Sequence, residues 1–355
     1  MMKSQKNTTA QPYSPKKMTA RLGVLLASLM VCSAGFAEVV IQQSTPSASI
    51  AWSDAQAGKF LSNDQPAASV NIEVKQRSSD AITTVLNNNT LANKYPTTST
   101  SYDAAQPNVN ARAAIVMDAQ TGEVLFSKNT NSALPIASVT KVMTAVVTAD
   151  ARLDMSERIR LEAIDFAGAG GKNSSSTLRA GDEMNRAELL LAALMKSENP
   201  AAAALARTYP GGRTAFVAAM NAKARQLGMH SSSFTESTGL DPRNVASARD
   251  LAILVSAASQ YGLIRQFSTT PNYDFNLGYR VLKSNNTNAL VRNGGWNINL
   301  SKTGYINEAG RCVVMEATVN QRPAVIVLLG ASTTAARNND ATNLMSWIGR
   351  SVRTL

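Results

Sequence analysis

A serine and a lysine stand three residues apart in the segment Ser138-Val139-Thr140-Lys141, which follows Pro135 and predicts the start of a helix. Side chains at this spacing lie on one face of a helix, so the amine can reach the hydroxyl. The helix N-terminus favours negative charge developing on the serine oxygen. A lysine among apolar residues can have a lowered pKa and accept the serine proton as a neutral amine. Alone the pattern is weak, because Ser14 and Lys17 repeat it by chance.

Two further motifs follow along the chain and carry groups that such a reaction needs. Ser197-Glu198-Asn199 comes after an apolar helix-forming stretch and before Pro200, where a hydroxyl and an amide can project into a cleft. Lys302-Thr303-Gly304 lies in a predicted strand, whose edge offers backbone donors and acceptors to an extended peptide. Its lysine and threonine can bind a carboxylate, and its glycine allows close approach of a backbone. Three motifs in this order predict serine acyl transfer with a lysine base.

Several other kinds of site are excluded by what the chain lacks. His230 is the single histidine, so a Ser-His-Asp mechanism has one candidate base, and we expect that residue to be structural or exposed. No Gly-x-Ser-x-Gly elbow is present. The two cysteines and one histidine do not make a zinc site, and no glycine-rich phosphate loop precedes a helix. We therefore expect neither a metal nor an organic cofactor.

The positive charge of the chain does not predict nucleic-acid binding. Of the formal net charge of +11, five bases precede the first acid, and the remaining 30 Lys and Arg face 24 Asp and Glu. The resulting +6 is scattered, with no basic run interleaved with aromatic residues. A mildly basic surface is compatible with an anionic cell envelope.

The N-terminal segment has the pattern of a secretory signal peptide over residues 1–37. Lysines and Arg21 lead into the apolar run 22–31, and small residues end at Ala37. Residues 38–110 are rich in Ser, Thr, Asn, Gln and Ala and predict a low-complexity flexible tether. Residues 111–355 then form the catalytic domain. Only Cys312 would remain after cleavage, so we expect no intramolecular disulfide and a buried strand position for this residue.

The remaining pattern predicts an α/β (α+β) fold in which helices are inserted into a sheet. Two strands joined by a turn begin the domain, and three strands and a helix end it. The simplest way to bury these faces is a five-stranded antiparallel sheet covered by helices on both faces. The predicted strands are 113–117, 124–126, 299–305, 311–319 and 324–329, and the predicted helices are 138–149, 186–195, 201–208, 214–227, 247–261 and 340–352. Ser247, three residues before Asp250, predicts a helix cap.

With these elements in place, the chain resembles a known family. The three motifs match those of penicillin-binding proteins and serine β-lactamases, which share a β-lactamase/transpeptidase-like fold. The segments around them resemble the low-molecular-mass D-alanyl-D-alanine peptidases from about Ala111 onward. The segments that carry this resemblance are 135–144, Ser237-Thr238-Gly239-Leu240-Asp241, 248–252 and Asn286-Thr287-Asn288.

The resemblance implies a role for each motif residue. Ser138 would attack the carbonyl after a D-alanine, with Lys141 as base. Ser197 would relay a proton to the leaving amine. The backbone N–H groups of Ser138 and Tyr305 would form the oxyanion hole. Asn199 would bind the substrate amide and help to position Lys141. Lys302 would add positive potential, and Thr303 would bind the substrate carboxylate.

Four activities fit the motifs, and endopeptidase is preferred. The chain stops at Leu355 after the predicted last helix, without the β-rich domain and C-terminal anchor of many carboxypeptidases, and so resembles soluble periplasmic endopeptidases that cut D-alanyl cross-links. The alternative is a carboxypeptidase that trims pentapeptides. A β-lactamase is less favoured because no Glu-x-x-Leu-Asn loop is present; the nearest segment begins at Glu236. A non-catalytic penicillin sensor is disfavoured by the intact motifs.

This preference predicts partners and a location. The expected substrates are peptidoglycan stem peptides, with β-lactams as covalent inhibitors. We expect no nucleic acid, no stable membrane anchor after signal cleavage, and a periplasmic location.

Overall fold

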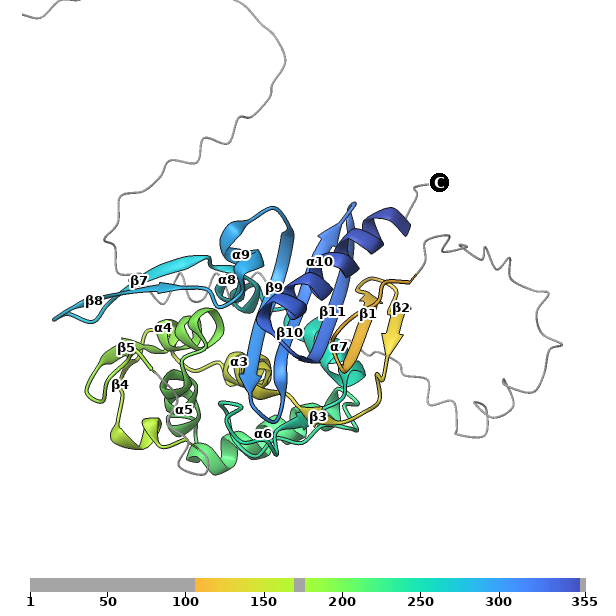
Figure 1. Ribbon diagram of the computed structural model, residues 1–355. Helices are drawn as coiled ribbons and strands as arrows, with labels where there is room; N and C mark the ends of the chain where they lie inside the picture. The colour runs from red at the N-terminus through yellow and green to blue at the C-terminus, as the bar shows by residue number, and fades with distance from the viewer. Residues whose placement is uncertain (1–105, 169–175, 352–355) are drawn as a thin grey trace, which may run out of the picture. The chain divides into compact units, whose positions relative to one another are not determined.

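One five-stranded antiparallel sheet organises the protein, a computed structural model of which describes residues 106–168 and 176–351. The strand order is β2-β1-β11-β10-β9, so the last three strands continue the first hairpin (Figure 1). The prediction of one antiparallel sheet is confirmed. The strands are β1 (Ala113–Asp118), β2 (Val124–Lys128), β9 (Asn297–Ile306), β10 (Gly310–Val319) and β11 (Arg322–Ala331).

The hairpin turn between β1 and β2 is fixed by one carboxylate. Asp118 Oδ1 accepts the backbone N–H groups of Gln120 and Thr121 at 2.8 and 2.9 Å. Gly122 closes the turn at φ +74°, a left-handed conformation that glycine adopts without strain. Strand β1 pairs with both β2 and β11.

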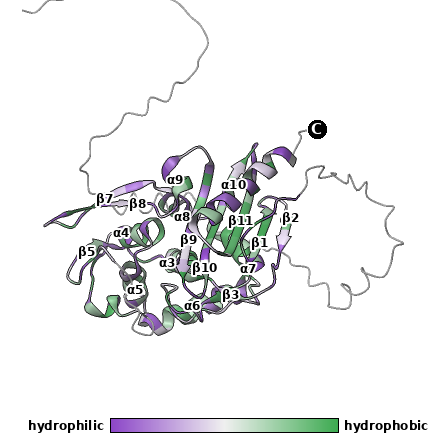
Figure 2. Cartoon of the chain, in the orientation of Figure 1, coloured by the Kyte–Doolittle hydropathy of each residue, from purple (hydrophilic) through white to green (hydrophobic). Residues whose placement is uncertain are grey.

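Each face of the sheet buries its own core, because side chains alternate along a strand. Ile115, Val325 and Val327 point to one face, where they pack with helices α3 (Thr140–Asp150) and α7 (Ala248–Ala258). Val116, Ile326 and Leu328 point to the other, against Leu344, Trp347 and Ile348 of α10 (Thr334–Ser351). The central strands are therefore hydrophobic along most of their length (Figure 2). Helices cover both faces, as predicted.

The helices between β2 and β9 lie close to the predicted ranges, with local corrections. The predicted cap is confirmed: Ser247 Oγ accepts the N–H of Asp250 at the start of α7. The helix predicted at 186–195 is α-helical only to Leu191 and then continues as a π-helical turn, η4. The helices are α3 (Thr140–Asp150), α4 (Arg186–Leu191), η4 (Ala192–Lys196), α5 (Asn199–Arg207), α6 (Gly212–Gln226), α7 (Ala248–Ala258) and α10 (Thr334–Ser351).

The last helix begins at Thr334 rather than Asp340, which is an error of six residues in the prediction. The Asn-rich stretch around Asn338 has low helix propensity, and packing of the apolar face against the sheet overrides it.

Several short elements escaped prediction, most of them strands too short to show a hydrophobic period. The hairpin of β7 and β8 follows helix α8, and two-stranded pairings join β4 to β5 and β3 to β6. The last of these ties the chain just before the Ser138 motif to the segment around Val245. The elements are β3 (Leu134–Pro135), β4 (Arg158–Arg160), β5 (Glu183–Asn185), β6 (Val245–Ala246), α8 (Gly262–Thr269), β7 (Asn272–Asn276), β8 (Val281–Asn285) and α9 (Ala289–Asn293).

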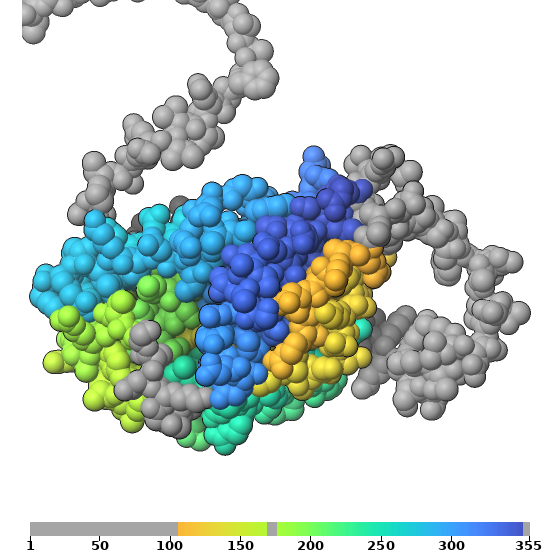
Figure 3. All heavy atoms as spheres, in the orientation of Figure 1, coloured from red at the N-terminus to blue at the C-terminus, as the bar shows by residue number. Residues whose placement is uncertain are grey.

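The beginning and end of the domain meet at the sheet. The backbone N–H groups of Asn110 and Ala111 donate to the carboxylate of Asp340 in α10 at 2.9 and 2.8 Å. Figure 3 shows the first strands and the last helix side by side on one face. Cys312 is fully buried in β10, as predicted. The predicted signal peptide and residues 38–105 of the predicted tether lie outside the described residues.

Candidate active site

The Ser138 motif sits where an extended segment turns into a helix. After β3, the short 3-10 turn η1 (Ala137–Val139) leads directly into α3. Ala137 has φ +48°, a left-handed conformation that costs energy for a residue with a side chain. This turn places Ser138 at the N-terminus of the buried helix, where the helix dipole favours negative charge.

Lys141 lies beneath Ser138 and is completely buried. Its Nζ donates to Ser138 Oγ at 2.9 Å, to Asn199 Oδ1 at 2.6 Å and to the backbone oxygen of Thr238 at 2.6 Å. Burial lowers the pKa of Lys141 from its ordinary 10.5 to about 7, against the opposing effect of the carboxylates of Glu236 and Glu198. A large fraction of this amine is therefore neutral at pH 7 and can accept a proton.

The serine and the asparagine of the second motif each bond to a different lysine. Ser197 ends η4 in a left-handed conformation, with φ 64°, and Asn199 begins α5 on the other side of Glu198. Ser197 Oγ accepts a hydrogen bond from Lys302 Nζ at 2.9 Å, while Asn199 bonds to Lys141. The sharp turn at Ser197 thus joins the second motif to both of the others.

The third motif lies on β9, the edge strand of the sheet. Lys302 is buried, with its Nζ also donating to the backbone oxygen of Thr303 at 2.8 Å. Burial lowers the pKa of Lys302 well below 10.5, and the nearby cations Lys141 and Arg337 lower it further. The hydroxyl of Thr303 donates to Thr287 Oγ1 at 2.8 Å.

Two glycines enclose the backbone around Ser138. A side-chain carbon at Gly304 would come within 3.0 Å of Ser138 N and 2.9 Å of Ile136 O. One at Gly239 would overlap the carbonyl of Ala137, 1.9 Å from its oxygen, and φ there is +83°. Any larger residue at either position would displace the turn that carries Ser138. Gly304 was predicted to allow close approach of a backbone, and the backbone that approaches is that of this turn.

Tyr305 follows Gly304 on β9 and exposes 47% of its surface. The guanidinium of Arg311, on the neighbouring strand, stacks over its ring at 3.4 Å from the ring centre. The side chain thus lies at the surface, while the backbone of Gly304 beside it passes Ser138 N.

The loop of residues 236–241 was quoted for the family resemblance but not predicted as part of the site. Its Thr238 carbonyl is one of the three partners of Lys141, and its Gly239 packs on Ala137. Glu236 and the fully buried Asn244 hold this loop by hydrogen bonds. No single residue type there signals chemistry, because the contribution comes from backbone atoms.

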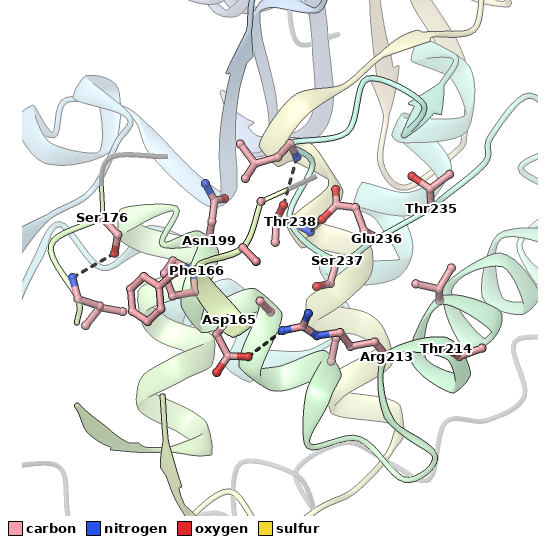
Figure 4. A pocket seen from close by; sticks show the side chains of 18 residues that line it. Asp165, Phe166, Ser176, Asn199, Arg213, Thr214, Thr235, Glu236, Ser237 and Thr238 are labelled. Carbon is pink, nitrogen blue, oxygen red and sulfur yellow. Dashed lines mark hydrogen bonds and ion pairs between the residues drawn. The ribbon is translucent and has the colours of Figure 1, made fainter. Parts of the chain in front are cut away.

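A pocket of about 760 Å³ opens beside Asn199 and Thr238. Figure 4 shows these residues with Glu236 on one side of it and Asp165 with Arg213 on the other. Arg213 Nη2 donates to Asp165 Oδ1 at 2.9 Å. Space is therefore available next to the Lys141 partners for part of a peptide.

Within residues 106–168 and 176–351, no three or more His, Cys, Asp and Glu side chains group in a way that could hold a metal ion. None of the helices in these ranges is both long and apolar enough to cross a membrane.

Comparisons with known proteins agree with this geometry. A family model described as D-alanyl-D-alanine carboxypeptidase matches residues 100–333. A D-alanyl-D-alanine endopeptidase of Pseudomonas aeruginosa is 44% identical over 250 residues, which cover 68% of this chain and 78% of that protein. One from Escherichia coli is 42% identical over 247 residues, covering 69% and 79%.

A solved structure shows the same fold. The structure of a DD-transpeptidase from Streptomyces superposes with a TM-score of 0.64 at 27% identity, covering 70% of this chain and all of that one. The five-stranded sheet with its covering helices is therefore the penicillin-binding, β-lactamase/transpeptidase-like fold. With the family model matching most of the described residues, the chain belongs to the D-alanyl-D-alanine carboxypeptidase family of serine peptidases.

Proposed function

We propose that the chain is an endopeptidase that hydrolyses D-alanyl cross-links in peptidoglycan through an acyl-enzyme on Ser138. The observation that carries the chemistry is the buried Lys141, whose Nζ lies 2.9 Å from Ser138 Oγ and whose pKa is about 7. A base with a pKa near the working pH is the most effective proton acceptor. The similarity to two proteins named D-alanyl-D-alanine endopeptidases supports the choice of substrate.

Acylation begins with proton transfer from Ser138 to the neutral amine of Lys141. The serine oxygen then bonds to the carbonyl carbon that follows a D-alanine, and the carbonyl oxygen becomes negatively charged. The N–H groups of Ser138 and Tyr305 stabilise this oxygen. No side chain fits between Gly304 and the backbone of Ser138, so β9 lies close to the turn that carries the first of these N–H groups.

Collapse of this intermediate requires a proton on the leaving amine. Ser197 relays it, and the hydrogen bond from Lys302 orients its hydroxyl. Asn199 binds the substrate amide and holds Lys141, while Lys302 and Thr303 provide the carboxylate site. Water then attacks the acyl-enzyme, with the Lys141 amine again taking a proton, and releases the peptide and free Ser138.

β-Lactams enter the same reaction as covalent inhibitors. Their amide lies in a ring, so the leaving amine stays tethered to the acyl group and continues to fill the site. One class of serine β-lactamases adds a dedicated carboxylate that activates water. Glu236, the nearest candidate in sequence, already accepts the N–H groups of Thr238 and Gly239 at 2.5 Å each. The penicilloyl-enzyme should therefore persist for minutes or longer.

Carboxypeptidase activity is the alternative, and it uses the same acyl-enzyme. The two reactions differ only in the leaving group: free D-alanine for a carboxypeptidase, and the amine-bearing side chain of a second stem peptide for an endopeptidase. The family model carries the carboxypeptidase description, whereas both relatives compared above carry the endopeptidase name.

Product analysis on purified peptidoglycan fragments tests the proposal. The enzyme is incubated with cross-linked dimers and, separately, with pentapeptide monomers, and the products are measured by mass spectrometry. We expect monomers from dimers, with free D-alanine from pentapeptides as a lesser product. Free D-alanine with intact dimers would make the chain a carboxypeptidase, and rapid multiple turnover of penicillin would make it a β-lactamase.

We also propose that the mature enzyme acts in the periplasm, with residues 1–37 as a cleaved signal peptide and residues 38–110 as a tether. The sequence pattern described above supports both assignments. N-terminal sequencing of the protein from the periplasmic fraction, with Glu38 as the expected first residue, tests the signal peptide.

A further inference from the structure

Glu236 holds a short loop by accepting three N–H donors. Its two carboxylate oxygens accept the consecutive backbone N–H groups of Thr238 and Gly239, each at 2.5 Å. The side-chain amide of Asn244 donates to the same carboxylate at 3.0 Å. A carboxylate presents two acceptor oxygens in a plane, so it matches two adjacent N–H donors that an amide side chain could not satisfy together.

The atoms that this carboxylate fixes are the ones that touch the reacting groups. The carbonyl of Thr238 accepts from Lys141 Nζ at 2.6 Å. Gly239 packs on the Ala137 carbonyl and on Ser138 N, where no side chain fits. A shift of this loop would therefore move the lysine amine and the oxyanion-binding N–H of Ser138 together.

Asn244 links the loop to the nucleophile segment from behind. It is fully buried, and its amide nitrogen donates to Thr140 Oγ1 at 3.1 Å. Its backbone oxygen accepts the N–H of Ile136 at 3.1 Å. Asn244, which bonds to Glu236, thus also holds a residue on each side of Ser138.

We propose that Glu236 is a positioning residue for acylation, which acts by holding Thr238 and Gly239 against Lys141 and Ser138. It contacts neither the substrate nor the reacting atoms in this proposal. The inference rests on the proposed roles of Ser138 and Lys141.

A simpler account would give Glu236 only an electrostatic effect, and the structure provides a matched control. Lys141 has two carboxylates, Glu236 and Glu198, and one cation, Lys302, in its electrostatic environment. Glu198 accepts hydrogen bonds from the side-chain hydroxyls of Ser176 and Thr177 at 2.5 and 2.6 Å, and its Oε1 also accepts the backbone N–H of Thr177 at 3.3 Å. In Glu198→Gln the amide oxygen can keep both bonds to Thr177 while the NH₂ group donates to the rotatable hydroxyl of Ser176, so one negative charge is removed with these bonds preserved.

Glu236→Gln removes the same charge but turns an NH₂ group towards a fixed backbone N–H. The experiment measures the second-order rate constant for acylation by a fluorescent penicillin across pH 5–9, for both variants and the parent. At high pH, where Lys141 is neutral, the rate constant should reach a plateau. We expect Glu236→Gln to lower this plateau by about 10- to 100-fold, as for a displaced catalytic group. The plateau rate constant of Glu198→Gln should stay within about twofold of that of the parent. In both variants the acid limb should move to lower pH, because a carboxylate that favours protonated Lys141 is gone.

Glu236→Asp separates the two accounts again, since it retains the charge but draws the carboxylate back by one methylene from where it meets Thr238, Gly239 and Asn244. An aspartate can accept N–H groups two and three residues ahead, as Asp118 does, but it then holds the loop in a different geometry. Positioning predicts a lowered plateau for this variant with the acid limb close to that of the parent. A plateau at the parent level in Glu236→Gln or Glu236→Asp overturns the proposal, as does an equal loss in Glu198→Gln.

Two controls keep this result independent of folding and of the proposed function. Rates are normalised to the active-site concentration, and the position of the acid limb does not depend on the amount of folded protein. Ser138→Ala should abolish labelling; labelling that survives there would overturn the proposed nucleophile, whereas a full-rate Glu236→Gln would overturn only the positioning role.

Discussion

Lys141 and Lys302 are buried lysines of one site in opposite electrostatic surroundings. Lys141 extends from α3 and has the carboxylates of Glu236 and Glu198 nearby, which partly offset the effect of burial and leave its pKa at about 7. Lys302 extends from β9, where burial and two cations, Lys141 and Arg337, all lower its pKa. Both side chains are at most 1% exposed, so burial does not distinguish them.

The difference shows how neighbours divide roles between identical side chains. A lysine with carboxylates nearby keeps a pKa near neutrality, which suits a base that must both take and release a proton. A lysine surrounded by cations lacks an anion, which a substrate carboxylate would supply. Loss of the proton from Lys141 also removes one repulsion on Lys302, so the charge state of each favours the function proposed for the other.

Replacement of Lys141 should give the largest effect. Lys141→Ala removes the proposed proton acceptor of Ser138, and we expect acylation by fluorescent penicillin to fall by about 10³-fold or more. Stopped-flow or gel-based labelling measures the rate, with near-ultraviolet circular dichroism as a check of folding. A rate within tenfold of the parent would show that another group takes the proton.

The pH dependence of acylation should report Lys141 rather than Lys302. The reactive amine is the neutral form, so the rate should fall about tenfold for each pH unit below about 7 and level off above it. The rate constant at limiting penicillin concentration, measured from pH 5 to 9, tests this. A rate that is flat across this range would mean that Lys141 does not titrate in the free enzyme.

Loss of Lys302 should have a smaller effect, concentrated on substrates with a free carboxylate. Lys302→Ala should slow acylation by about 10- to 100-fold, the usual worth of one hydrogen bond to a charged group. A substrate whose carboxylate is converted to an amide should already be slow with the parent and lose little more in the variant. An equal loss of acylation rate for both substrates would show that Lys302 does not bind the substrate carboxylate.

Replacement of the same lysine by an apolar residue of similar length should stabilise the fold. The unfolded chain binds a proton at Lys302 more readily than the folded chain does, so stability attributable to this group rises as pH approaches 10.5. Lys302→Met should therefore raise Tm, by about 2–4 °C per kcal/mol, most at low pH. Lys283→Met, at an exposed position on β8, is the control and should change Tm little. A destabilised Lys302→Met would show that its hydrogen bonds outweigh its desolvation.

The smallest effect should come from the single histidine. His230 is exposed in the turn that follows α6. His230→Ala should leave the acylation rate within about twofold of the parent, as expected of a surface substitution. A loss of tenfold or more would reopen a mechanism with a histidine base.

Local periodicity was enough to predict the sheet and most of the helices. The strands around Ile115 and Val327 are nearly continuous apolar runs, because both faces of the sheet are covered, and such runs can be recognised without knowledge of their partners. The hairpin of β7 and β8 was missed, since its exposed Tyr279 and Val281 do not follow the alternation of a buried strand.

The sequence by itself also determined the three motifs, because Ser138, Lys141, Ser197, Asn199 and Lys302 act through side chains whose types and order are visible in one dimension. Only the tertiary structure decided how they are held. Thr238 binds Lys141 through a carbonyl, which every residue type has, and Gly239 contributes by lacking a side chain where the Ala137 backbone passes. The opposite surroundings of the two lysines arise likewise from residues more than 30 positions away in the chain, such as Glu236 and Arg337. The burial and electrostatic surroundings of a side chain depend on every element that packs around it, and the local sequence does not show which elements those are.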